Sequence, residues 1–135
     1  MSDLVADVRA FHEKFGVPVG ELPRLLSDRD FSYRLEFLRE ELGELLEAHQ
    51  RYDAAGFIDA LVDLTYVAIG TALWGGYDFD AHWAEVQRAN LAKVKVERAV
   101  LSRRSHEQDV VKPLGWQPPR HEPLFLVTRH ARVEG

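Results

Sequence analysis

Acidic side chains recur at helical spacing in the first half of the chain. Glu40, Glu41 and Glu44 lie within one segment, and Glu47 follows one turn later. At about 100° per residue, Glu40, Glu44 and Glu47 share one helix face, and Glu41 lies at its flank. Such a stripe is typical of a solvated face on an amphipathic helix, and it is equally a candidate set of metal ligands.

A second acidic pair lies in a segment that is otherwise apolar. Asp59 and Asp63 are one helical turn apart and are the only charged residues from 57 to 74. Burying an unpaired carboxylate is costly, so these side chains need a cation, a proton or strong donors. The alternative is structural: Asp59 caps a helix, and Asp63 pairs with an arginine such as Arg34 or Arg39.

Two helices that each offer carboxylates at this spacing can bring several oxygens to one point. Like charges held that close repel unless a cation neutralises them. Hard oxygen donors without cysteine favour Mg²⁺, with Mn²⁺ as a substitute, and the Glu-x-x-His pattern of di-iron bundles is absent. Magnesium held in this way takes further ligands from phosphates, which predicts phosphoryl transfer to water. Glu41 or Glu44 is the candidate to orient or deprotonate that water.

Phosphate binding also requires basic and amide donors. Asn90 and Lys93 are three residues apart and therefore share a helix face, and Lys112 lies in the tail. We consider these three the candidate substrate-binding residues. The alternative is an ordinary solvated helix surface.

Apolar periodicity and breakers predict four helices joined by short connections. The expected ranges are 2–15, 30 or 32 to 53, 57–74, and 78 or 80 to 101. The second should bury a seam formed by Leu35, Leu38, Leu42, Leu45, Leu46 and Tyr52. The third is apolar on nearly every face and should be buried. Gly43 and Gly70 either allow these two helices to approach closely or are simply tolerated.

The sequence therefore predicts an all-α four-helix bundle over residues 1–102. A proline-rich, irregular tail follows over residues 103–135, with a short strand expected at 124–128. We expect this tail to lie on the bundle or on a partner subunit.

Composition limits the classes of function. The 135 residues contain no cysteine and carry a formal net charge of −5, so neither thiolate metal sites nor a global attraction to nucleic acid is expected. The N-terminus lacks a signal-peptide pattern, and the apolar stretch 64–76 is too short and interrupted to span a bilayer. We therefore expect a cytoplasmic protein without nucleic-acid or membrane partners.

Four segments, in order, resemble the MazG-like and phosphoribosyl-ATP pyrophosphohydrolase-like all-α nucleoside triphosphate pyrophosphohydrolases. The Glu-Glu-x-x-Glu motif of this group is matched by Glu40, Glu41 and Glu44, and the final Asp of its Glu-x-x-Asp motif by Asp63. Ala60 stands where that second motif has Glu, and Asp59 is the candidate to replace it. The other matching segments are residues 11–16, the run from 86 to Lys93, and the tail with Lys112 and its two prolines.

The resemblance implies a Mg²⁺-dependent enzyme that cleaves a (deoxy)nucleoside triphosphate between the α- and β-phosphates, in a dUTPase-like branch that sanitises or balances a nucleotide pool. It also implies a homodimer or a dimer of dimers with the nucleotide near the subunit interface. The gap at Ala60 implies one metal ligand fewer or a displaced site. Two alternatives stay open: a non-catalytic helical binding module on the same scaffold, and phosphoribosyl-ATP hydrolysis.

Overall fold

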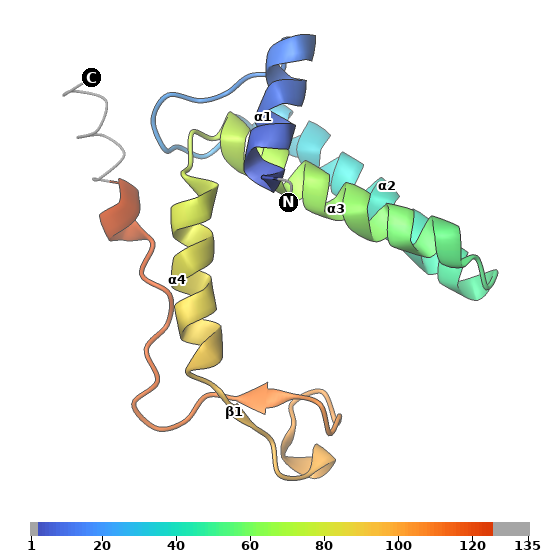
Figure 1. Cartoon of the computed structure of the whole chain (residues 1–135), viewed down its shortest axis with the longest axis vertical. Helices are drawn as coiled ribbons and strands as arrows, with labels where there is room; N and C mark the ends of the chain where they lie inside the picture. The colour runs from blue at the N-terminus through green and yellow to red at the C-terminus, as the bar shows by residue number, and fades with distance from the viewer. Residues whose placement is uncertain (1–2, 126–135) are drawn as a thin grey trace.

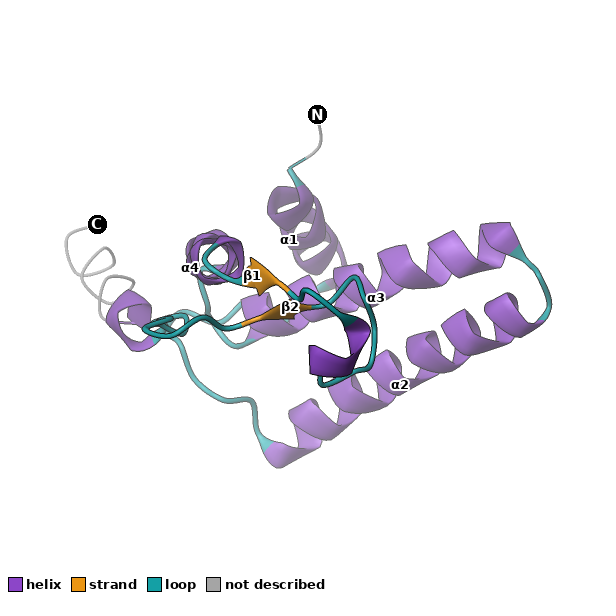
Figure 2. Ribbon diagram, turned by 90° about the horizontal axis from the view of Figure 1, so that it is seen from below, coloured by secondary structure: helices purple, strands orange, loops and turns teal. Residues whose placement is uncertain are grey.

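A long antiparallel hairpin of two helices forms the frame of the protein in its computed structural model, which describes residues 3–125. α2 (Asp28–Gln50) and α3 (Ala54–Trp74) lie side by side along most of their length, as both views show (Figures 1 and 2). α1 (Leu4–Phe15) crosses one end of α3, and α4 (Phe79–Leu91) runs away from the hairpin (Figure 1). The predicted all-α fold class is confirmed.

Each of these four α-helices is preceded by an N-cap residue whose side chain accepts a hydrogen bond from a backbone N–H of the first turn. The caps are Asp3, Ser27, Asp53 and Asp78. Asp78 agrees with the predicted start of the fourth helix. The second helix begins earlier than predicted, because Ser27 and not Asp30 or Ser32 supplies the cap.

Asp53 accepts a hydrogen bond from the Gly56 amide at 3.0 Å and so caps α3. Asp59 lies inside the helix, beyond its first turn, and does not cap it. The structural alternative for Asp59 is therefore wrong.

The fourth helix ends at Leu91, ten residues earlier than expected. The chain then forms β1 (Val94–Lys95), a 3₁₀ turn (Ala99–Leu101) and β2 (Val110–Val111), with β1 and β2 paired antiparallel. Valines at positions 94, 96, 110 and 111 favour this extended pairing over helix.

The tail does not contain the expected strand in the part that the structure describes. Residues 122–125 form a helical turn, and positions 126–128 of the predicted strand lie outside the described residues. Between β2 and this turn the chain runs back along α4 (Figure 1).

The hydrophobic core is small and lies where α1 meets the C-terminal half of α3. Val8, Ile69 and Leu73 are its buried centre, with Val5, Tyr66 and Phe79 packed around them. Much of the predicted seam of α2 is not buried: Leu42 and Leu46 are 57% and 59% exposed. Several apolar side chains of α3 are exposed as well, among them Ile58 and Val62.

α3 is long and apolar enough to cross a membrane by length and composition, with a mean hydropathy of 1.5. It is longer than the interrupted stretch recognised in the sequence, because the helix begins at Ala54. A core helix of a soluble protein meets the same criterion, so this single helix is weak evidence for a membrane.

Replacing Asp53 by Ala should lower the free energy of unfolding by about 1 kcal/mol, since it removes the side-chain cap of α3. Urea denaturation measures this change. Asp59→Ala is the matched control and should not destabilise the metal-free protein, because it removes a carboxylate from an acidic cluster. Equal losses in both variants would contradict the assignment of the cap.

Candidate active site

Carboxylates from α2 and α3 face one another across the middle of the hairpin. Glu41 is buried at 9% exposure, and its pKa is raised by burial and by the neighbouring charges of Glu44, Asp63 and Asp59. The pKa of Asp63 is also raised, by burial first and then by Asp59 and Glu44. We call these four residues the acidic cluster. Packing of the two helices therefore brings together carboxylates that are distant in sequence.

The arginines that the structural alternative required do not neutralise Asp63. Arg34 donates instead to the Val67 carbonyl at 2.9 Å and to the Thr71 hydroxyl at 3.0 Å. None of the ion pairs within residues 3–125 involves Arg39 or Asp63. The acidic cluster thus has no protein cation beside it in the described chain.

One carboxylate oxygen of the cluster is orphaned. Oε2 of Glu41 is buried and has no hydrogen-bond partner among the described residues. An unsatisfied buried polar atom of this kind calls for an explanation, such as an ion or a ligand that binds there. The donor set is all carboxylate oxygen, which suits a hard divalent cation.

No three potential ligand side chains already surround a single point within residues 3–125. Magnesium usually keeps several waters and is bound through one or two carboxylates plus substrate phosphates, so it does not require a complete protein cage. The residues present therefore fit such an ion, with Glu41, Glu44, Asp59 and Asp63 as the group that would hold it.

Glu40 lies outside this cluster. Its side chain is exposed on α2, and it is not among the groups that shift the pKa of Glu41 or Asp63. Its role as a metal ligand remains a prediction from the resemblance. Ala60, at the position of the missing motif Glu, is buried at 1% exposure, so a longer side chain there would need room that this packing does not provide.

The predicted phosphate-binding residues form a separate group at the far end of α4. Lys93 donates to the Asn90 side chain at 2.9 Å, and Lys93 and Lys112 both lie over the Trp116 ring, at 5.7 and 4.7 Å from its centroid. The structure thus brings the three predicted residues together. Within one chain, α4 carries them away from the acidic cluster (Figure 1).

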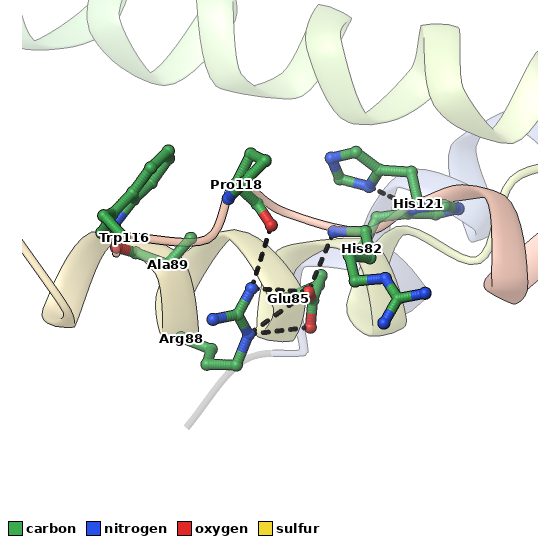
Figure 3. A network of polar contacts seen from close by, with 8 residues as sticks. His82, Glu85, Arg88, Ala89, Trp116, Pro118 and His121 are labelled. Atoms are coloured by element: carbon green, nitrogen blue, oxygen red, sulfur yellow. Dashed lines mark hydrogen bonds and ion pairs between the residues drawn. The ribbon is translucent and has the colours of Figure 1, made fainter. Parts of the chain in front are cut away.

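The tail is fastened along α4 by specific polar contacts (Figure 3). Glu85 accepts from the Arg88 side chain and from the Arg120 amide, and these bonds lower its pKa to about 2. Arg88 also donates to the Pro118 carbonyl at 3.1 Å, and Trp116 donates to the Ala89 carbonyl at 2.7 Å. These bonds fix the position of Trp116 and hence of the lysines around it.

The largest described cavity, about 740 Å³, begins at the acidic cluster and extends toward α1. Besides Glu41 and Asp63, it is lined by aromatic side chains and by His12 and Arg34. Neither His12 nor Arg34 has a site role that was predicted from the sequence. Gly70, on the same helix stripe as Asp59 and Asp63, is the sequence feature that could have indicated their role. A Cβ at this position would approach the Arg34 and His12 side chains to 2.7 and 2.8 Å.

Comparison with known families identifies the family to which this helical hairpin with its facing carboxylates belongs. The model of the phosphoribosyl-ATP pyrophosphohydrolase family matches residues 8–90, more than half of the chain. The chain belongs to this family, which is part of the MazG-like all-α nucleoside triphosphate pyrophosphohydrolase superfamily. No curated protein matches the sequence.

The matched region contains the whole acidic cluster, Arg34, His12 and Asn90, but it ends before Lys93 and Lys112. Family membership implies a pyrophosphohydrolase activity on a nucleotide-like substrate. It does not distinguish a nucleoside triphosphate from phosphoribosyl-ATP.

The raised pKa values of Glu41 and Asp63 predict how the stability of the metal-free protein depends on pH. Because the folded protein holds these protons at a pH where the unfolded chain has released them, the two groups contribute less stability as pH rises from the ordinary carboxyl values through the raised ones. Glu41→Gln should therefore be more stable than the wild type at high pH, and the difference should shrink at low pH.

Thermal unfolding in EDTA across a pH series measures that difference. Glu36→Gln, an exposed position on the same helix, is the matched control and should follow the wild type. A wild type that exceeds Glu41→Gln in stability at high pH would show that Glu41 is not held in a repulsive acidic environment.

Proposed function

We propose that this protein hydrolyses a (deoxy)nucleoside triphosphate to the monophosphate and pyrophosphate with the help of Mg²⁺ or Mn²⁺. The observation that carries the proposal is the acidic cluster between two helices, which has no protein cation beside it in the described chain and includes a buried Glu41 oxygen without a hydrogen-bond partner. Phosphoribosyl-ATP is an equally supported substrate on the family match alone.

Glu41, Glu44, Asp59 and Asp63 are the side chains that would hold the metal, with Glu40 as a further candidate ligand. When bound, the divalent cation would neutralise the phosphate oxygens and the charge that develops on the leaving pyrophosphate. A nucleotide brings the anionic ligands that this all-carboxylate site lacks, and the cation offsets the repulsion within the cluster.

Glu41 is suited to act as the general base. Its carboxylate is partly unpaired within the acidic cluster, and burial and the neighbouring carboxylates raise its pKa in the metal-free protein. In the proposed step, the oxygen of a water molecule attacks the α-phosphorus and its proton passes to Glu41. A new P–O bond forms, and the bond to the bridging oxygen breaks and releases pyrophosphate.

We further propose that the active enzyme is a homodimer or a dimer of dimers in which one chain supplies the acidic cluster and its partner supplies Asn90, Lys93 and Lys112. Two observations support this. The basic group lies apart from the acidic cluster within one chain (Figure 1), and apolar side chains of α2 and α3 such as Leu46 and Ile58 remain exposed. Exposed apolar surface of this extent marks interaction sites.

Pyrophosphate release should occur from at least one substrate in a panel of NTPs, dNTPs and phosphoribosyl-ATP, and EDTA should abolish it. Asp63→Asn and Glu44→Gln should each lower kcat by about 100-fold or more, because metal stabilisation of the transition state is worth several kcal/mol. Glu47→Gln is the matched control: Glu47 is exposed on the same helix, paired with Arg51, and should keep full activity.

Circular dichroism should show unchanged helicity in all three variants. Metal-dependent release of pyrophosphate from phosphoribosyl-ATP alone would identify phosphoribosyl-ATP as the substrate. No release from any substrate, together with no thermal shift by Mn²⁺, would favour the non-catalytic binding module.

A shared site predicts complementation between inactive chains. Asp63→Asn lacks a metal ligand, and a Lys93→Ala, Lys112→Ala double variant lacks the basic group. Refolding the two together should restore part of the activity, because some mixed dimers contain one intact site. Each variant refolded alone is the control, and no recovery in mixtures that do form mixed dimers would place both groups in one chain's own site.

A further inference from the structure

The cavity next to the acidic cluster has two chemically different ends. One end carries the carboxylates of Glu41 and Asp63, and the other is walled by rings and by one buried guanidinium, that of Arg34. The aromatic residues that line it are Phe11, Phe15, Tyr33, Phe37, Tyr66 and Trp74. A volume of about 740 Å³ falls within the range of small-molecule sites, and aromatic walls suit a planar ring system.

Arg34 is a buried cation without an anionic partner. The residue is 7% exposed, and no carboxylate pairs with it within residues 3–125. The Thr71 hydroxyl accepts from its Nε and the Val67 carbonyl accepts from its Nη2. Because a guanidinium carries five N–H groups, both N–H groups of Nη1 and one of Nη2 are left without a protein acceptor in the described chain.

Two aromatic rings lie beside this guanidinium, which also lines the cavity. Its central carbon lies 5.8 Å from the ring centroid of Phe37 and 5.8 Å from that of Trp74. The two bonds to α3 fix its orientation. A donor fork that is preorganised in this way favours an acceptor in the plane of a flat ligand.

Arg34 lies at a distance along the hairpin from the acidic cluster, where the phosphates and the metal would bind. Arg34 and Glu41 are seven residues apart on α2, which corresponds to roughly 10 Å along the helix axis. With the phosphates held at the acidic cluster, Arg34 is therefore placed for the nucleoside end of a nucleotide and not for its phosphates.

His12 adds an uncharged hydrogen-bond acceptor to the lining of the same cavity. Its Nδ1 donates to the Pro18 carbonyl at 3.0 Å, which leaves Nε2 as the unprotonated acceptor of the neutral ring. Burial and the nearby charge of Arg34 lower its pKa. Gly70 makes the arrangement possible, because a Cβ there would press against both Arg34 and His12.

We propose that Arg34 is a specificity-determining residue that donates to a carbonyl oxygen of the substrate base, so that the enzyme selects uracil, thymine, guanine or cytosine nucleotides over adenine nucleotides. Adenine has no carbonyl, and its 6-amino group lies beside the N1 and N7 acceptors, so a donor fork that meets either of these edges is left partly unpaired. This inference rests on the proposed nucleotide hydrolysis and narrows its substrate class.

Binding of uncharged deoxynucleosides tests base recognition without phosphates, metal or turnover. Calorimetric titration of the wild type should show tighter binding of deoxyuridine, thymidine, deoxyguanosine and deoxycytidine than of deoxyadenosine, by on the order of 10- to 100-fold. Equal or tighter binding of deoxyadenosine, or no binding of any deoxynucleoside, would overturn the proposal.

Arg34→Met should reduce the affinity for the four carbonyl-bearing deoxynucleosides to that for deoxyadenosine. Arg39→Met, an exposed position on the same helix, is the matched control and should keep the selectivity. If Arg34→Met fails to fold, Thr71→Val removes one bond that orients the guanidinium and should reduce the selectivity in part.

The same variants in pyrophosphate release separate this proposal from the proposed function. Selective binding without any hydrolysis would refute the function and retain base recognition. Hydrolysis that is as fast for dATP as for the other dNTPs would refute base recognition and retain the function. If Arg34→Met lowers the rate of hydrolysis equally for every dNTP and also for inorganic tripolyphosphate, Arg34 contacts the phosphates and the proposal is overturned.

Discussion

The packing of α2 against α3 holds like-charged carboxylates beside one another, and the remaining features of the site follow from that contact. Each helix alone would present its acidic residues to water, where they repel weakly. Side by side, the helices bury Glu41 and partly bury Asp63, raise the pKa of both, and leave one Glu41 oxygen without a partner. The hairpin therefore stores an electrostatic cost that a divalent cation and its phosphates are suited to relieve.

The same hairpin also carries a buried positive charge, nearer the start of α2. Arg34 is held by two acceptors of α3 and by the rings of Phe37 and Trp74, about two turns from the acidic cluster. A nucleotide has a matching polarity, with anionic phosphates at one end and a planar, hydrogen-bonding base at the other. One rigid pair of helices can thus position both ends of such a substrate, which is how elements far from the reacting atoms contribute to orientation.

A single chain leaves part of this frame unfinished. The core is confined to the junction of α1 and α3, apolar side chains of the hairpin such as Leu46 remain exposed, and Lys93 and Lys112 are carried away on α4 and the tail. The tail itself is well fastened, since Glu85 and Trp116 bond across to it and to α4. We propose that a second copy covers the hairpin and brings the basic group to the acidic cluster.

The sequence by itself determined the helical class, most helix starts to within a few residues, and the acidic motif on each of two helices, because these depend on local spacing and on capping chemistry. It also determined the membership that the family match shows over residues 8–90. Sequence periodicity could not show that Leu42 and Leu46 stay exposed, because it marks an apolar face without telling which partner covers it. Nor could spacing decide between Asp59 and Asp53 as the cap, or between Asp63 and Thr71 as the partner of Arg34. Only the tertiary structure decided these points, since Arg34 and Thr71 are 37 residues apart and meet through the register of the hairpin.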